Sequence, residues 1–210
     1  MLIEQPSSFL RWMYPKALWR MDEGTRTVYL TFDDGPIPES TPFILETLKA
    51  FCVKATFFVV GENAARYPEL MQAIVADGHQ IGNHTYNHLG SFRHWSSTYW
   101  VNTFRAQQVI DRYIPIGEER PLFRPPHGWM RPTSYYWLSK VFRVVMWDVV
   151  TRDYSRYMTA DDVVENVRKY TRNGSIITFH DSLKSIDKLH YALPETLSWL
   201  KAEGLECGIL

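Results

Sequence analysis

The sequence of 210 residues has only two cysteines, Cys52 and Cys207, which lie far apart in apolar surroundings. Two such residues do not build a disulfide framework, and we expect both to be buried free thiols. A low-complexity run and a Gly/Ser linker are also lacking. Because 45% of the residues are hydrophobic, the chain can bury one large core, and we predict a single domain.

Net charge and long apolar runs are absent as well. The 23 basic residues balance the 23 acidic ones, so neither nucleic acid nor an anionic membrane is an implied partner. No stretch approaches the roughly 18 apolar residues that a membrane-spanning helix needs, and we predict no transmembrane segment.

The N-terminal segment, residues 1–26, lacks the continuous apolar stretch of a secretory signal, because charged residues interrupt it. This feature predicts a cytoplasmic location. We expect the segment to pack on a catalytic domain formed by residues 27–210. Its aromatic side chains are expected to cover one end of that domain rather than to bind lipid.

Two adjacent carboxylates, Asp33 and Asp34, close an apolar run that begins at Val28, and a Gly35-Pro36 breaker follows them. Carboxylates on a turn at the end of a strand are held still and open to a ligand, as a metal ligand or a general base must be. Their mutual repulsion calls for a cation nearby. By itself the pattern fits an ordinary Asp-Gly turn equally well.

Two histidines, His84 and His88, follow downstream at a spacing that lets both side chains reach one point. Together with Asp34 they make a three-ligand set for Zn²⁺ or a similar divalent ion, with one position left open for water and substrate. A histidine pair alone is weaker evidence, since such pairs also occur on surfaces by chance.

Three further segments each end a short apolar stretch with an ionisable group. Phe123–Gly128 carries Arg124, Trp147–Tyr154 carries Asp153, and Ile176–Asp181 carries His180.

In this order, the five segments resemble the motifs of the polysaccharide deacetylases of the NodB-homology type, carbohydrate esterase family 4. The family motifs are T-F-D-D-G, H-[S/T]-x-x-H, R-P-P-Y-G, D-x-x-D-W and L-x-H. The first two match in full, and the resemblance runs from about Val28 to about Asp181. It implies a distorted (β/α)7 barrel in a single α/β domain. It also implies an enzyme that hydrolyses carbon–nitrogen bonds other than peptide bonds.

Four positions depart from the family motifs. His127 stands where the third motif has Tyr, Val150 and Tyr154 replace the first Asp and the Trp of the fourth, and Thr178 replaces the Leu of the fifth. These changes touch the walls of the acyl pocket rather than the reacting groups, so they bear on the identity of the substrate.

Periodicity predicts the same architecture independently. The expected strands are 27–32, 54–60, 79–84, 122–126, 141–148, 175–181 and 205–210. The expected helices begin near Thr41 and cover 68–77, 96–114, 132–140, 159–172 and 194–203. Strands that alternate with helices favour parallel βα units, in which the carboxyl ends of the strands share one active face.

The expected chemistry is amide hydrolysis. A divalent ion on Asp34, His84 and His88 would activate water and polarise the acetyl carbonyl; we expect Zn²⁺, with Co²⁺ or Ni²⁺ as alternatives. Asp33 is the expected base, and Arg124 would hold it ionised.

The remaining roles concern the leaving group and the acyl pocket. The backbone N–H of His127 would complete an oxyanion hole. His180 is the expected acid for the leaving nitrogen, and Asp153 would fix its tautomer and raise its pKa. Tyr154 and Thr178 are expected to contact the substrate.

We therefore predict a metal-dependent hydrolase that removes acetyl groups from N-acetylated sugars of a glycan or oligosaccharide. Two alternatives stay open: an amidase of the same scaffold acting on a non-sugar amide or a cyclic ureide, and an inactive relative that only binds glycan.

Overall fold

The computed structural model describes residues 4–114 and 119–210. Its centre is a parallel eight-stranded sheet. The strands are β1 (Thr27–Asp33), β2 (Thr56–Val59), β3 (Gln80–Asn83), β4 (Leu122–Phe123), β5 (Arg143–Val144), β6 (Val149–Val150), β7 (Ile176–His180) and β8 (Glu206–Gly208). The order is β5-β4-β3-β2-β1-β7-β6, with β8 paired to β1 outside this path.

The path of seven strands curls without closing, since β5 and β6 lie at its two ends. This sheet is the predicted distorted (β/α)7 barrel in a single α/β domain. Strand β1 holds its centre because its β-branched and aromatic residues suit a buried strand. Its carboxyl end pairs with β7 so that Asp33 lies opposite His180. The register therefore sets two predicted site residues side by side.

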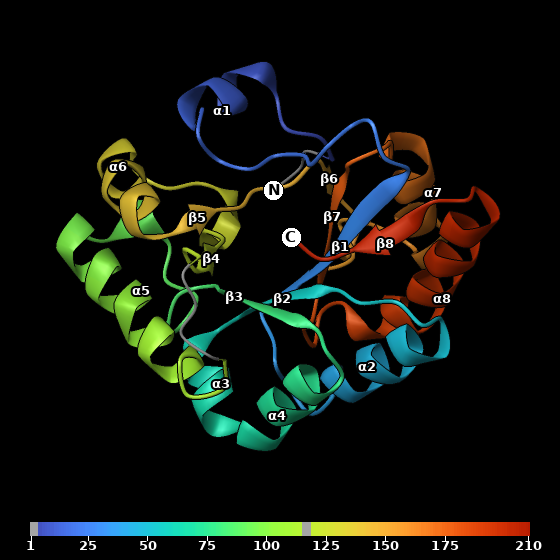
Figure 1. The fold of residues 1–210 in the computed structure, drawn as a ribbon, viewed down its shortest axis with the longest axis horizontal. Helices are drawn as coiled ribbons and strands as arrows, with labels where there is room; N and C mark the ends of the chain where they lie inside the picture. The colour runs from blue at the N-terminus through green and yellow to red at the C-terminus, as the bar shows by residue number, and fades with distance from the viewer. Residues whose placement is uncertain (1–3, 115–118) are drawn as a thin grey trace.

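Helices surround the outside of the sheet (Figure 1). They are α1 (Ser8–Met13), α2 (Thr41–Ala50), α3 (Gly61–Arg66), α4 (Pro68–Ala76), α5 (Ser96–Ile110), α6 (Pro132–Val141), α7 (Ala160–Tyr170) and α8 (Ile186–Ala202). Two short 3₁₀ turns, η1 (Ser91–Arg93) and η2 (Pro126–Gly128), lie in the loops after β3 and β4. None of the helices in the described parts of the chain is both long and apolar enough to cross a lipid bilayer.

The predicted strand at 141–148 is wrong. Helix α6 runs to Val141, and the apolar stretch that follows divides into β5 and, after Asp148, β6. The buried Asp148 side chain separates the two short strands, and a continuous apolar pattern did not reveal this break. The seven strands of the barrel are therefore β1 to β7, and the predicted last strand lies beside β1.

Helix boundaries differ most where proline or glycine occurs. Pro194 was expected to begin the last helix but lies inside α8, which begins at Ile186. Helix α3 was not predicted, because it opens on Gly61. Thr159 caps α7, with Asp162 completing a capping box, and this helix begins where it was predicted.

The core has an aliphatic part around β1 and an aromatic part beneath α1 and α6. In the N-terminal segment, of which residues 1–3 lie outside the described part, Tyr14 and Trp19 are buried whereas Phe9 and Trp12 are exposed. The expectation of two buried thiols is wrong, because Cys52 is exposed just after α2 and Cys207 is only partly buried.

Candidate active site and metal centre

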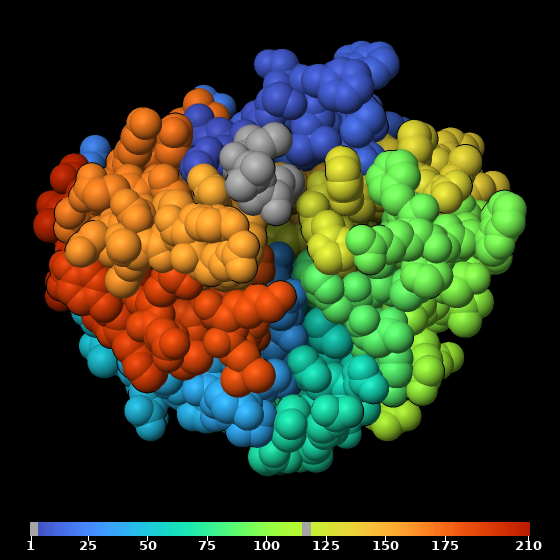
Figure 2. Space-filling view, turned by 180° about the vertical axis from the view of Figure 1, so that it is seen from behind, coloured from blue at the N-terminus to red at the C-terminus, as the bar shows by residue number. Residues whose placement is uncertain are grey.

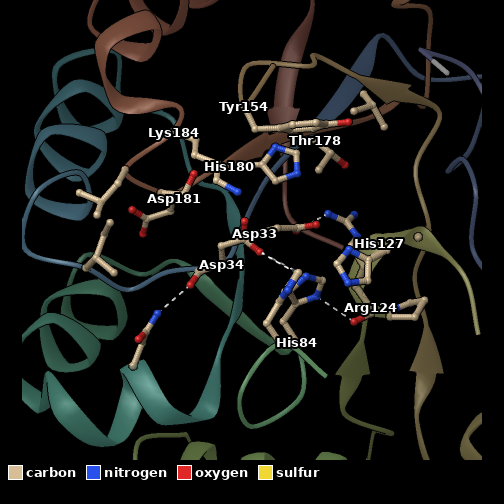
Figure 3. Close-up of a pocket in the computed structure, with 18 of the residues that line it drawn as sticks. Asp33, Asp34, His84, Arg124, His127, Tyr154, Thr178, His180, Asp181 and Lys184 are labelled. Atoms are coloured by element: carbon tan, nitrogen blue, oxygen red, sulfur yellow. Dashed lines mark hydrogen bonds and ion pairs between the residues drawn. The ribbon is translucent and has the colours of Figure 1, made fainter. Parts of the chain in front are cut away.

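A cavity of about 580 Å³ opens at the carboxyl ends of the strands. In Figure 2 it appears as a hollow, with the orange residues after β6 and the red residues after β7 on one side and the green and yellow residues after β3 and β4 on the other. Nine of the ten predicted site residues line it, and the tenth, Asp153, lies buried behind His180. Figure 3 shows most of these side chains converging from different strands.

One side of the cavity holds the three predicted metal ligands. The Asp34 carboxylate atom Oδ1 lies 3.2 Å from Nε2 of His88 and 3.6 Å from Nε2 of His84. One ligand atom of each residue lies within 4.8 Å of the others. The buried Oδ1 of Asp34 accepts no hydrogen bond from any described residue. A carboxylate oxygen that accepts no hydrogen bond and lies beside two imidazoles fits a divalent ion bound by one oxygen and two nitrogens.

The protonation states suit such a site. His84 uses Nδ1 to bond the Arg124 carbonyl oxygen at 2.8 Å, which leaves Nε2 with a free lone pair toward Asp34. Burial lowers the pKa of His84 to about 4, so the imidazole is neutral near pH 7. Burial acts to raise the pKa of Asp34, but the surrounding histidines, His180 first, outweigh it and hold that pKa below the usual range.

The loops that carry these ligands adopt unusual backbone angles. Asp34, Thr85 and His88 have φ values of 81°, 65° and 56°, in the left-handed region that non-glycine residues rarely occupy. Local bonds hold them there: Asn63 donates to the Asp34 carbonyl at 2.9 Å, and the Thr85 hydroxyl accepts from the backbone N–H of Leu89 at 2.9 Å. Backbone strain of this kind concentrates at functional sites.

Asp33 forms a buried ion pair with Arg124, 2.7 Å from Oδ1 to Nη1. The guanidinium also donates to the Thr31 hydroxyl and the Met146 carbonyl, and lies 4.1 Å from the centre of the Phe58 ring. Burial lowers the pKa of Arg124 from its usual value. The fixed cation keeps the adjacent carboxylate oriented toward the cavity.

On the opposite side, His180 is paired with Asp153. Its Nδ1 lies 2.7 Å from Oδ1, and its backbone N–H donates to Oδ2 at 2.7 Å. Burial acts to lower the pKa of His180, but the charge and hydrogen bond of Asp153 outweigh it and raise that pKa to about 9. Lys188 holds the backbone of Asp153 by donating to its carbonyl at 2.7 Å.

The three predicted substrate residues lie at the cavity wall. His127, with φ 62°, is exposed, and its ring packs edge-on against His88 at 4.7 Å. The ring of Tyr154 packs against His180 at 4.6 Å. The hydroxyl of Thr178 lies 3.2 Å from that of Thr31, at the floor between β7 and β1.

One buried carboxylate, Asp181, was given no role by the sequence. It accepts hydrogen bonds from the hydroxyls of Ser40 and Thr41, and its backbone N–H donates to the Asp33 carbonyl at 2.7 Å. Burial raises its pKa to about 7. A Cβ on Gly35 would lie 2.0 Å from its Oδ2, so only glycine fits beside it. Helix α2 begins at Thr41 as predicted; its cap position is Ser40, and the Thr41 hydroxyl donates to Asp181.

Comparison with known proteins agrees with this geometry. Residues 20–141 match the family model described as polysaccharide deacetylase. A peptidoglycan-N-acetylglucosamine deacetylase of Bacillus cereus is 36% identical over 183 residues, and the match covers 84% of this chain and 64% of that protein. A chitooligosaccharide deacetylase of Bradyrhizobium sp. is 37% identical over 159 residues, covering 75% and 72%.

A solved structure shows the same fold. It is a peptidoglycan N-acetylglucosamine deacetylase with a bound N-hydroxybenzamide derivative, with a TM-score of 0.88 and 31% identity over 95% of this chain and 94% of that one. The chain belongs to the polysaccharide deacetylase family. This membership confirms the predicted family, fold and class of enzyme.

Proposed function

We propose that this protein is a metal-dependent deacetylase that releases acetate from N-acetylglucosamine units of a glycan or oligosaccharide. The observation that carries the proposal is one cavity in which the Asp34/His84/His88 cluster lies beside two pre-formed pairs, Asp33–Arg124 and His180–Asp153. The names of its relatives, peptidoglycan and chitooligosaccharide deacetylases, support the substrate class.

Asp34, His84 and His88 would hold the metal ion, and two nitrogens with one oxygen favour Zn²⁺, with Co²⁺ or Ni²⁺ as alternatives. A divalent ion bound there supplies Lewis-acid chemistry, which polarises the acetyl carbonyl and makes water more acidic.

The protein's own groups move the protons. Asp33, oriented by its ion pair with Arg124, takes a proton from the water that attacks the carbonyl carbon. The backbone N–H of His127 donates to the oxygen on which negative charge develops.

Collapse of the tetrahedral species breaks the carbon–nitrogen bond. His180 gives its Nε2 proton to the leaving nitrogen, because Asp153 holds Nδ1 and keeps the ring protonated up to about pH 9. The products are acetate and the free amine of the sugar.

The cavity wall offers apolar surface for the acetyl group and the sugar. Tyr154 and Thr178 line it next to His180, and aromatic ring faces pack well on sugar rings. The relatives reported above are sugar deacetylases, so an amidase acting on a non-sugar amide or cyclic ureide gains no support. The complete set of ionisable groups speaks against an inactive glycan-binding relative. The cytoplasmic location expected from the N-terminal segment stays a prediction.

The test is acetate release from chitooligosaccharides and peptidoglycan fragments, with protein stripped of metal and then reloaded with Zn²⁺, Co²⁺ or Ni²⁺. We expect activity to return with metal, and His84→Ala and His88→Ala to lose bound metal and activity together. His94→Ala is the matched control, since His94 is exposed outside the cavity. Full metal occupancy in both ligand variants would remove the assignment of the metal site.

A further inference from the structure

The balanced net charge conceals a strong separation of charge along the chain. Three segments, residues 5–21, 78–110 and 120–147, contain no aspartate or glutamate. The same segments contain ten lysines and arginines. They form α1, α5 and α6, which follow one another around one side of the molecule in Figure 1, whereas α2, α7 and α8 lie on the other side. We call the exposed side chains of these segments the acid-free face.

The acid-free face is also the apolar face. Ten of the fourteen large apolar side chains that are exposed among the described residues belong to it. Its aromatic members include Phe9, Trp12, Trp95, Trp129, Tyr136 and Trp137, each at least half exposed. An accumulation of this kind marks an interaction surface rather than the scattered apolar residues of an ordinary surface.

Contacts between the elements hold α1, α5 and α6 next to one another. The rings of Tyr14, after α1, and Tyr135 of α6 pack at 5.1 Å, and the Tyr135 hydroxyl accepts the backbone N–H of Lys16. Trp100 of α5 packs against Trp137 of α6 at 6.1 Å. Helix α6 is thus apolar on two sides, with Tyr135 in the core and Trp137 outward.

Four exposed cations of the face are not paired with a carboxylate. Among the residues that the structure describes, Lys16, Arg93, Arg105 and Lys140 are exposed and form no ion pair. The ammonium of Lys140 lies 4.2 Å from the centre of the Tyr136 ring and 4.3 Å from that of Trp137. Cationic and aromatic groups are therefore presented together.

We propose that the acid-free face docks this protein on a membrane surface that carries anionic lipid headgroups. Tryptophan and tyrosine favour the headgroup region, where the ring lies among apolar chains and its polar edge stays hydrated. Lysine and arginine gain from the negative surface potential, and the lack of carboxylates removes the opposing repulsion.

The positive charge of the acid-free face favours an anionic membrane over two other partners, a neutral glycan and a second copy of this protein. A neutral glycan would gain nothing from unpaired cations. A second copy of the same face would bring like charges together. The docking is peripheral, and it is independent of the activity proposed above.

The test uses the protein of 210 residues and sedimentation with vesicles of phosphatidylcholine, with or without phosphatidylglycerol. We expect binding only to the anionic vesicles, and weaker binding as salt is raised. Trp137→Ala should weaken binding about tenfold, since it removes a large apolar contact, and Lys140→Ala about fivefold, since it removes one charge. Trp12→Ala on α1 should also weaken it, which guards against a local effect on α6.

Tyr191→Ala and Lys201→Ala are the matched controls, because both residues are exposed on α8, outside the acid-free face. They should bind as the unmodified protein does. An unchanged midpoint of urea unfolding shows that each variant is folded. Equal loss in the control variants, equal binding to vesicles without anionic lipid, or no binding at all would overturn the proposal. So would a dimer in solution that Trp137→Ala dissociates, or tighter binding to a soluble glycan than to vesicles.

Discussion

The two ends of the barrel both bury carboxylates beside arginine, but they satisfy them differently. At the amino ends of β6 and β7, Asp148 is fully buried and both its oxygens are saturated. Oδ1 accepts from Arg11 and from Arg172, each at 2.8 Å, and Oδ2 accepts from Arg172 at 3.0 Å and from the Ser175 hydroxyl at 2.8 Å. At the carboxyl ends, Asp34 keeps an oxygen that no described residue hydrogen-bonds.

The backbone differs between the ends in the same way. Six non-glycine residues in the described chain have positive φ, and five of them lie in the loops around the cavity. These are Asp34, Thr85, His88, His127 and Arg152, whereas the sixth, Cys52, follows α2. Strained backbone thus gathers where ligands must bind, and the fully paired Asp148 lies at the far end, where it stabilises the fold.

The largest expected effect is at the cavity end. Asp33→Asn keeps the size of the side chain but removes its basicity, so turnover should fall about a thousandfold while bound metal is unchanged. The variant should also lose stability, because the buried Arg124 charge loses its carboxylate partner. Acetate release and metal content, each per folded protein, check this. A rate near that of the unmodified protein would mean that another group activates the water.

The next largest effect is at the amino end. Asp148→Asn should lower the free energy of unfolding by about 2 kcal/mol, less than for a fully buried pair because Arg11 and Arg172 are partly exposed. Activity of the folded fraction should be unchanged. Urea unfolding and acetate release measure the two. Lost activity at unchanged stability would contradict the contrast between the ends.

The pH dependence of that effect follows from the pKa of Asp148. Burial acts to raise this pKa, but hydrogen bonds from Arg172, Ser175 and Arg11 outweigh it and hold it below the usual range. A depressed carboxyl pKa stabilises the fold above the unfolded-state pKa of about 3.9. The stability difference between Asp148→Asn and the unmodified protein should therefore be full near pH 7 and shrink as the pH falls below about 4.

The cavity end of the barrel could largely be predicted from the sequence, whereas the Asp148 cluster at the opposite end could not. The motifs specify both the type and the position of the site residues. For this reason β1 and β7 were predicted within two residues at each end, and nine of the ten predicted site residues line the cavity. The role of Asp181 was missed because its partners, Ser40 and Thr41, looked like the start of a helix. The Asp148 cluster was also missed, since Arg11 and Arg172 are distant in sequence.

The next effect in size is on proton transfer in the cavity by His180, which is paired with Asp153. In Asp153→Asn the main influence that raises the pKa of His180 is gone, and burial then lowers that pKa. An acid catalyst must be protonated, so activity of the unmodified protein should fall as the pH rises through about 9. In the variant this alkaline limb should move down by at least about one pH unit. The acid limb should move less.

Initial rates of acetate release over about pH 5 to 10, at saturating metal, check this shift. Lys184→Ala is a useful control, because Lys184 lines the same cavity, whereas the lysine that donates to Asp153 is Lys188. An unshifted alkaline limb in Asp153→Asn would mean that Asp153 does not tune the acid, or that His180 is not the acid.

The smallest expected effect concerns the stability cost of a left-handed backbone, compared at a residue of the cavity and at a residue outside it. His88 and Cys52 have nearly the same left-handed backbone, with φ of 56° and 57°, but only His88 lies at the cavity. Glycine adopts this conformation without a steric penalty, so each replacement by glycine should stabilise the metal-free protein by up to about 1 kcal/mol. Cys52→Gly should keep full activity, whereas His88→Gly should lose metal and activity. Urea unfolding after chelation, with acetate release, compares them. If His88→Gly is instead less stable than the unmodified metal-free protein, then His88 is held by contacts that favour its conformation, and the strain at the cavity end is smaller than its backbone angles imply.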